Sequence, residues 1–130
     1  MLDKAHIRIA RPSPNLETIA DFYIRVLGFL EVGRFVDHNG FDGVMIGFAG
    51  GGYHLEFTQC KNHQVQPSPT TEDLLVFYVP DPEDWRELVD KIESSGVSPV
   101  TPLNPYWDAN GRTYCDPDGY RFVVQNAAWR

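Results

Sequence analysis

YHLEFT, residues 53–58, follows a run of three glycines and alternates polar and apolar side chains. In a β-strand successive side chains point to opposite faces, so His54 and Glu56 share one face while Leu55 and Phe57 share the other. An imidazole and a carboxylate two residues apart on one face can bind a metal, transfer a proton or face water. The rest of the sequence has to distinguish these three roles.

The same order of elements occurs twice along the chain. Gly28 and Gly96, each expected to end a helix, lie about 68 residues apart, and GYHLE (52–56) aligns with GYRFV (119–123). The first round is a strand at 5–10, a helix from 16 to 27, and strands at 29–36, 43–48 and 53–59. The second is a strand at 74–79, a helix beginning at 82, and strands at 98–103, 112–115 and 120–125. This pattern predicts an α+β fold built from a duplicated strand-helix-three-strand module.

The sequence predicts a single domain over residues 1–130. It contains a first βαβββ module at 1–60, a polar, proline-containing linker at 61–73, and a second βαβββ module at 74–130. The two modules are expected to bury a common core and to curl a mixed sheet around a cavity. Ligand sites tend to form in such concave places.

Composition excludes several classes of function. The net charge of −7 is the opposite of a nucleic-acid-binding surface, and no apolar run approaches the ~20 residues of a membrane helix. The N-terminus lacks a signal-peptide pattern, so we expect a cytoplasmic protein. Cys60 and Cys115 match no CxxC spacing and are expected to be reduced.

Three stretches resemble one superfamily: LETIADFYIRVLGF (16–29), YHLEFT (53–58) and DPDGYRFVVQN (116–126). Together they resemble the vicinal oxygen chelate superfamily, the group of glyoxalases, bleomycin-resistance proteins and extradiol dioxygenases. The resemblance implies paired βαβββ modules whose curved sheet encloses a cavity. By analogy with the family, it also implies a homodimer.

The resemblance implies a metal site that this chain does not complete. Metal-dependent members take one ligand from the first and one from the last strand of each module, and Glu56 matches the last-strand glutamate of module one. Its counterpart in module two is Val123, and the first-strand counterpart is Leu75 or Val76, all apolar. At most two of four ligands are present, whereas such metals generally need three. We therefore expect neither metal nor other cofactor, and a divalent metal is the alternative.

The first-strand position of module one is Arg8, or His6 if the loop at 11–14 holds an insertion. Arg8 is predicted to replace the metal as the counter-charge of Glu56, because an unpaired charge in a cavity is costly. Arg11 is the alternative partner.

Four more residues are candidates for ligand binding. His54 is expected to be a general base or a hydrogen-bond donor, or else simply structural or exposed, and Arg121 is its repeat partner. Tyr106 and Trp107 are expected either to stack on a flat or cationic ligand or to pack against a neighbouring module or subunit. His38 and His63 are expected to face solvent.

Two functions fit these candidate residues. A purely structural or regulatory domain is a third interpretation that the sequence leaves open. The first is a metal-independent protein that binds a small molecule in its cavity and sequesters a toxic or antibiotic compound. The alternative is a glyoxalase- or dioxygenase-like enzyme with a degenerate metal site and Glu56 as the base. In both, the expected partner is a small molecule, with no nucleic acid and no membrane.

Overall fold

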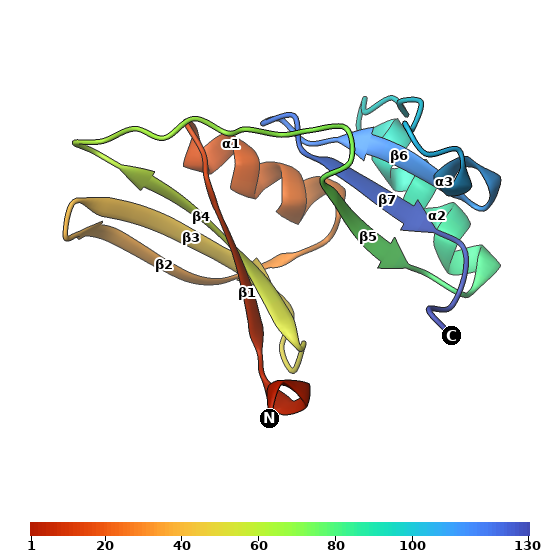
Figure 1. The fold of residues 1–130 in the computed structure, drawn as a ribbon, viewed down its shortest axis with the longest axis horizontal. Helices are drawn as coiled ribbons and strands as arrows, with labels where there is room; N and C mark the ends of the chain where they lie inside the picture. Colours follow the sequence, from red (N-terminus) through yellow and green to blue (C-terminus); the bar gives the residue numbers. More distant parts are fainter. The chain divides into compact units, whose positions relative to one another are not determined.

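The computed structural model describes all 130 residues, which form two compact units, Met1–Pro67 and Ser68–Arg130. Each unit contains one mixed sheet and a small number of helices (Figure 1). The predicted α+β class is confirmed. None of the helices reaches the length and apolarity that a membrane crossing needs.

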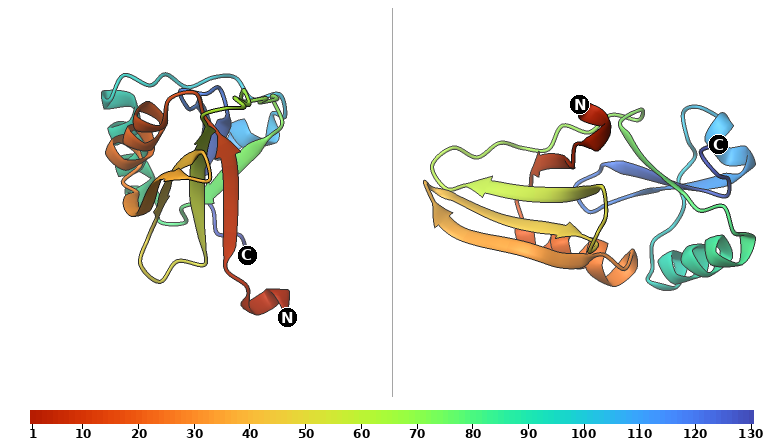
Figure 2. Two further views of the ribbon diagram at one scale, coloured as in Figure 1. Left: turned by 90° about the vertical axis from the view of Figure 1, so that its left-hand side faces the viewer. Right: turned by 90° about the horizontal axis from the view of Figure 1, so that it is seen from below.

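The first unit is a four-stranded sheet with helical segments on one face (Figure 2). Strand β1 runs parallel to β4 at one edge, and β4, β3 and β2 continue in antiparallel order. The elements are η1 (Leu2–Lys4), β1 (Ile7–Pro12), α1 (Leu16–Asp21), η2 (Phe22–Val26), β2 (Leu30–His38), β3 (Phe41–Gly47) and β4 (Tyr53–Cys60).

Helix α1 begins where the sequence predicts, because the Asn15 side chain accepts a hydrogen bond from the backbone N–H of Thr18. The predicted helix does not stay regular to residue 27, since its second half widens into the π-helical turn η2. The buried side of α1 and η2 packs on β4, where the rings of Tyr23 and Phe57 lie 5.4 Å apart. The core of this unit therefore lies on the face that carries Leu55 and Phe57.

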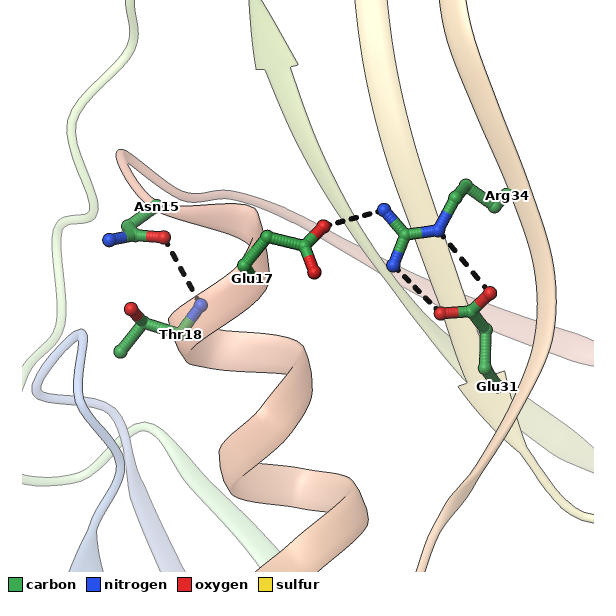
Figure 3. A network of polar contacts seen from close by, with 5 residues as sticks. All are labelled: Asn15, Glu17, Thr18, Glu31 and Arg34. Carbon is green, nitrogen blue, oxygen red and sulfur yellow. Dashed lines mark hydrogen bonds and ion pairs between the residues drawn. The ribbon is translucent and has the colours of Figure 1, made fainter.

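Arg34 connects the edge strand β2 to α1 (Figure 3). Its Nη1 lies 2.6 Å from Glu17 Oε1 on the helix, and its Nη2 lies 2.8 Å from Glu31 Oε1 on its own strand. The Arg34 Nε also donates to Glu31 Oε2, so the guanidinium holds that carboxylate with both of its oxygens. This network fixes the start of the helix against the strand that is farthest from β1.

The second unit is a three-stranded sheet in the order β5, β7, β6, with β5 parallel and β6 antiparallel to β7. Helix α2 packs on one face, where Ile92 is fully buried and the Trp85 indole N–H donates to the backbone oxygen of Val124. The elements are β5 (Leu74–Tyr78), α2 (Pro82–Ser94), α3 (Tyr106–Ala109), β6 (Gly111–Cys115) and β7 (Arg121–Gln125).

One predicted strand of the second unit is wrong. Residues 98–103 form only an isolated bridge between Val100 and Thr113, because Pro99 and Pro102 remove backbone donors that a ladder needs. The segment that follows forms the short helix α3. Just before this helix, the side chain of Asn104 accepts a hydrogen bond from the backbone N–H of Tyr106.

Candidate functional site

Strands β1 and β4 place a group of polar side chains on the face of their sheet that has no helix. In the parallel ladder Arg8 lies opposite His54, and Ala10 lies opposite Glu56. Paired residues of adjacent strands point to the same side, so Arg8, His54 and Glu56 share the face opposite the core residues Leu55 and Phe57. The alternation read from YHLEFT therefore holds in the structure.

The predicted ion pair between Arg8 and Glu56 is present. Arg8 Nη1 lies 3.1 Å from Glu56 Oε2, and Glu56 is only 8% exposed, although it lies on the helix-free face. A carboxylate this buried requires a counter-charge, and the guanidinium supplies it. Arg11, the alternative partner, lies opposite Phe57 in the ladder and so belongs to the other face of the sheet.

His54 is held by hydrogen bonds at both ring nitrogens. The Arg8 Nε–H donates to His54 Nε2 over 2.9 Å, and His54 Nδ1 lies 2.5 Å from His6 Nε2. Because a guanidinium only donates, Nε2 must accept and the neutral ring must carry its proton on Nδ1. Burial first, and then the charges of Arg8 and His6, lower the pKa of His54 below 6.5, while Glu56 partly opposes this shift.

His6 adds a fourth member to this group, which we call the Arg8 cluster (His6, Arg8, His54 and Glu56). It directly precedes β1, and its ring centroid lies 4.8 Å from that of His54. The sequence left open whether His6 or Arg8 occupies the first-strand position. Both contact His54, and only Arg8 reaches Glu56.

Three ladder neighbours lie on the cluster's own face. Gly47 pairs with His54 and Ala10 pairs with Glu56, so neither of these two projects a large side chain over the polar groups, whereas Met45 of β3 pairs with Glu56 from the other side. A Cβ at Gly47 would lie 3.0 Å from the Cβ of His54, a close approach that glycine permits. Arg8 remains half exposed, so its guanidinium is accessible from solvent.

The Arg8 cluster does not fit the metal that the fold implies. The chain contains no group of three His, Cys, Asp or Glu side chains that could hold a metal ion. Glu56 forms an ion pair with the positive guanidinium, His54 accepts a hydrogen bond from it, and His54 has no unused ring nitrogen. In the second unit the ladder pairs Val76 with Val123, so both repeat-related positions are valines on one face.

The remaining predicted site residues belong to the second unit. Arg121 donates to the backbone oxygen of Thr101, and Tyr106, which is 63% exposed, meets the half-buried Trp107 edge to face at 4.9 Å. His38 and His63 are exposed, as predicted. Cys60 and Cys115 are both free thiols.

Two family models match this chain. The YycE-like N-terminal domain matches residues 7–58, and the YycE-like C-terminal domain matches residues 72–126. The chain is 44% identical over 123 residues to the uncharacterized protein YycE of Bacillus subtilis (strain 168), covering 95% of this chain and 88% of that protein.

The fold is also similar to solved structures. The crystal structure of a Bacillus subtilis YycE protein, described as of unknown function and of the glyoxalase/fosfomycin resistance type, matches with a TM-score of 0.89 and 42% identity over 98% of this chain and 93% of that one. Leishmania major glyoxalase I matches with a TM-score of 0.70 and 18% identity over 92% of this chain and 84% of that chain.

TnmS3, an antibiotic binding protein from Streptomyces sp. CB03234, matches with a TM-score of 0.66 and 19% identity over 93% of this chain and 94% of that chain. At these low identities the last two likenesses show the fold alone. The family models, the full-length identity to YycE and the shared fold agree with the resemblance drawn from the sequence: the chain belongs to the YycE-like family, within the vicinal oxygen chelate superfamily.

Proposed function

We propose that the protein binds a small organic molecule at the Arg8 cluster without a metal. The observation that carries this proposal is the ion pair between Arg8 and the buried Glu56, which places a fixed positive charge beside the carboxylate that metal-dependent relatives would use as a ligand. A guanidinium has five N–H donors, and this one uses Nε toward His54 and Nη1 toward Glu56. The remaining donors suit an oxygen acceptor on the ligand.

Three further features support a binding site. Arg8 is half exposed, the adjacent Gly47 and Ala10 are small, and the hydrogen bonds to His54 hold the Arg8 side chain in place. A donor that is already positioned loses less conformational entropy on binding. TnmS3, which has the same fold, is described as an antibiotic binding protein, and this supports sequestration of a toxic or antibiotic compound as the biological role.

The alternative is an enzyme in which Glu56 is the base, favoured by the likeness of the fold to a glyoxalase I. The Arg8 contact weighs against it, because the guanidinium already occupies the Oε2 oxygen of the carboxylate that would act as the base. Carbonyl chemistry also needs an electrophile to stabilise the developing negative charge, and only the Arg8 guanidinium lies next to Glu56 in this cluster.

The test has two stages. The purified protein is titrated with Ni²⁺, Zn²⁺, Mn²⁺ and Fe²⁺ by calorimetry, and we expect no stoichiometric binding that depends on Glu56. Tight binding that Glu56→Gln abolishes would overturn the metal-independent site. The metal-free protein is then screened with fosfomycin, bleomycin and pyruvate by thermal shift, since a ligand at 100 times its Kd stabilises the folded state by about 2.7 kcal/mol.

The matched variants are Arg8→Ala and Arg25→Ala. Arg25 also forms an ion pair on the first unit, with Asp21 on the same helical segment, but lies outside the cluster. We expect Arg8→Ala to remove the shift caused by a binding probe and Arg25→Ala to keep it. Equal shifts in the two variants, or no shift with any of the three probes, would count against a ligand site at Arg8.

A further inference from the structure

The negative charge of the chain is concentrated in its second unit. Residues 68–130 contain five Lys and Arg against eleven Asp and Glu, a net charge of −6, whereas residues 1–67 contain six against seven, a net charge of −1. A unit with this imbalance attracts cations. Charge alone defines no binding site. A cation site also needs an acidic group beside a surface that can bind the cation.

Such a surface exists beside α3. A hollow of about 520 Å³, open mouth included, is lined by Leu74, Leu103, Trp107 and Glu72 together with three smaller or polar residues. Leu103 is 61% exposed, and Trp107, which also lines the hollow, is half buried. The lining of the hollow therefore includes apolar residues, one aromatic residue and one acidic residue, and it contains no Lys or Arg.

The Trp107 ring is held in position by its own segment. The side chain of Asn104 accepts from the N–H of Tyr106, and the backbone oxygen of Asn104 accepts from the N–H of Trp107. Tyr106 supports the indole edge to face at 4.9 Å, and α3 lies next to β6 (Figure 1). An aromatic ring fixed in this way recognises a cation with little loss of conformational entropy.

Glu72 supplies the one negative charge in the lining of the hollow. Its backbone N–H donates to the Thr70 hydroxyl, which itself donates to Asp73, so the turn that carries Glu72 is ordered. No Lys or Arg of this unit forms an ion pair with Glu72. Two of the unit's arginines, Arg112 and Arg130, lie instead over the rings of Trp85 and Trp129.

We propose that this hollow is a second binding site, independent of the Arg8 cluster, which takes an organic cation. The ligand carries an ammonium group with small apolar substituents. Its methyl or methylene groups pack on Leu74, Leu103 and the Trp107 ring, and its charge lies over the indole face with Glu72 as counter-ion.

The experiment uses the whole chain and choline, with 3,3-dimethyl-1-butanol as a neutral molecule of the same shape. Calorimetric titration should show saturable choline binding at millimolar concentration, and binding of the neutral molecule at least about 10-fold weaker. Equal binding of the two molecules, or no saturable choline binding, would overturn the proposal.

Variants locate the site. We expect Trp107→Leu to weaken choline binding about 10-fold and Glu72→Gln to weaken it several-fold, with Trp107→Phe intermediate. The controls are Trp129→Leu, at a largely exposed tryptophan in the same unit, and Glu83→Gln, at an acidic residue of α2. Should Trp107→Leu fail to fold, Glu72→Gln and Glu83→Gln decide the question, and equal affinity of those two would contradict it.

Discussion

Arg8 contacts two side chains of the neighbouring strand at once: its Nη1 lies 3.1 Å from Glu56 Oε2, and its Nε donates to His54 Nε2 over 2.9 Å. One guanidinium thus neutralises a buried carboxylate and sets the tautomer of the neutral imidazole ring.

Replacing Arg8 by Ala should lower the free energy of unfolding by about 1–2 kcal/mol at pH 7, because Glu56 is left buried without its counter-charge. The estimate is kept below the usual range for a fully buried pair, since Arg8 is half exposed and solvent screens it. Urea denaturation measures the change. The double variant with Glu56→Gln should recover part of the loss, because no unpaired charge is then buried.

The control for that measurement is Arg25→Ala, which breaks an ion pair whose two side chains are both largely exposed. It should change stability by less than about 0.5 kcal/mol. If Arg8→Ala costs no more than Arg25→Ala, the counter-charge role of Arg8 is wrong.

Stability should fall on acidification because of His54. Its folded pKa lies below 6.5, so the fold favours the neutral ring. A depressed pKa contributes stability that is complete above pH 6.5 and is lost as the pH falls from 6.5 through the folded pKa. Burial of the ring is the first cause of this lowered pKa, followed by the nearby charge of Arg8; a proton on Nε2 would also displace the hydrogen bond from Arg8.

Unfolding free energies measured between pH 8 and pH 5 test this dependence. His54→Gln should flatten the slope just below pH 6.5, whereas His63→Gln, at an exposed residue, should keep it. A slope that survives in His54→Gln would assign the acid sensitivity to another group.

The Arg34 network should contribute modestly to stability. Arg34→Ala removes contacts to Glu17 and to both oxygens of Glu31, and we expect a loss of about 0.5–1 kcal/mol because all three side chains are at least one-third exposed. High salt should reduce the difference between wild type and variant. Arg34→Lys should restore less than half of the loss, since an ammonium cannot make the two-pronged contact. Full restoration by lysine would show that charge alone matters there.

Two adjacent hydroxyls of β6 should respond to removal with opposite signs. Thr113 Oγ1 is buried and has no protein partner, so Thr113→Val should raise stability by about 1 kcal/mol. The neighbouring Tyr114 hydroxyl donates to Glu93 over 2.7 Å, so Tyr114→Phe should lower stability by a similar amount. Burial and the Glu93 contact also raise the pKa of Tyr114, which keeps its hydroxyl protonated as the donor. Thermal unfolding of both variants checks the signs, and a destabilised Thr113→Val would mean that its hydroxyl has a partner.

The sequence predicted those parts of the structure that depend on periodicity. Alternation in YHLEFT placed His54 and Glu56 on one face. The resemblance to the superfamily pointed to Arg8 as the partner of Glu56, and the parallel ladder brings the first strand beside the last. The alternatives His6 and Arg11 were separated only by the ladder register, which a single sequence does not fix.

Contacts and conformations outside the periodic pattern were not predicted. The link from Arg34 to Glu17 joins a strand to a helix, and no spacing rule connects those positions. Residues 98–103 look like a strand by composition, yet their prolines leave a single bridge. The hollow beside α3 is lined by Glu72, Leu103 and Trp107 together, and Glu72 is brought to the other two only by folding.

The parallel pairing of β1 with β4 also has a consequence for the order of folding. Strands β2, β3 and β4 follow one another along the chain and pair with their sequence neighbours, so they close short loops. Strand β1 can pair only after β4, more than 40 residues downstream, has been synthesised, and this pairing closes the longest loop of the sheet. During synthesis, therefore, Arg8 leaves the ribosome before His54 and Glu56, and its contacts with them require that β1 pairs with β4. Assembly of the polar cluster marks the completion of the first sheet.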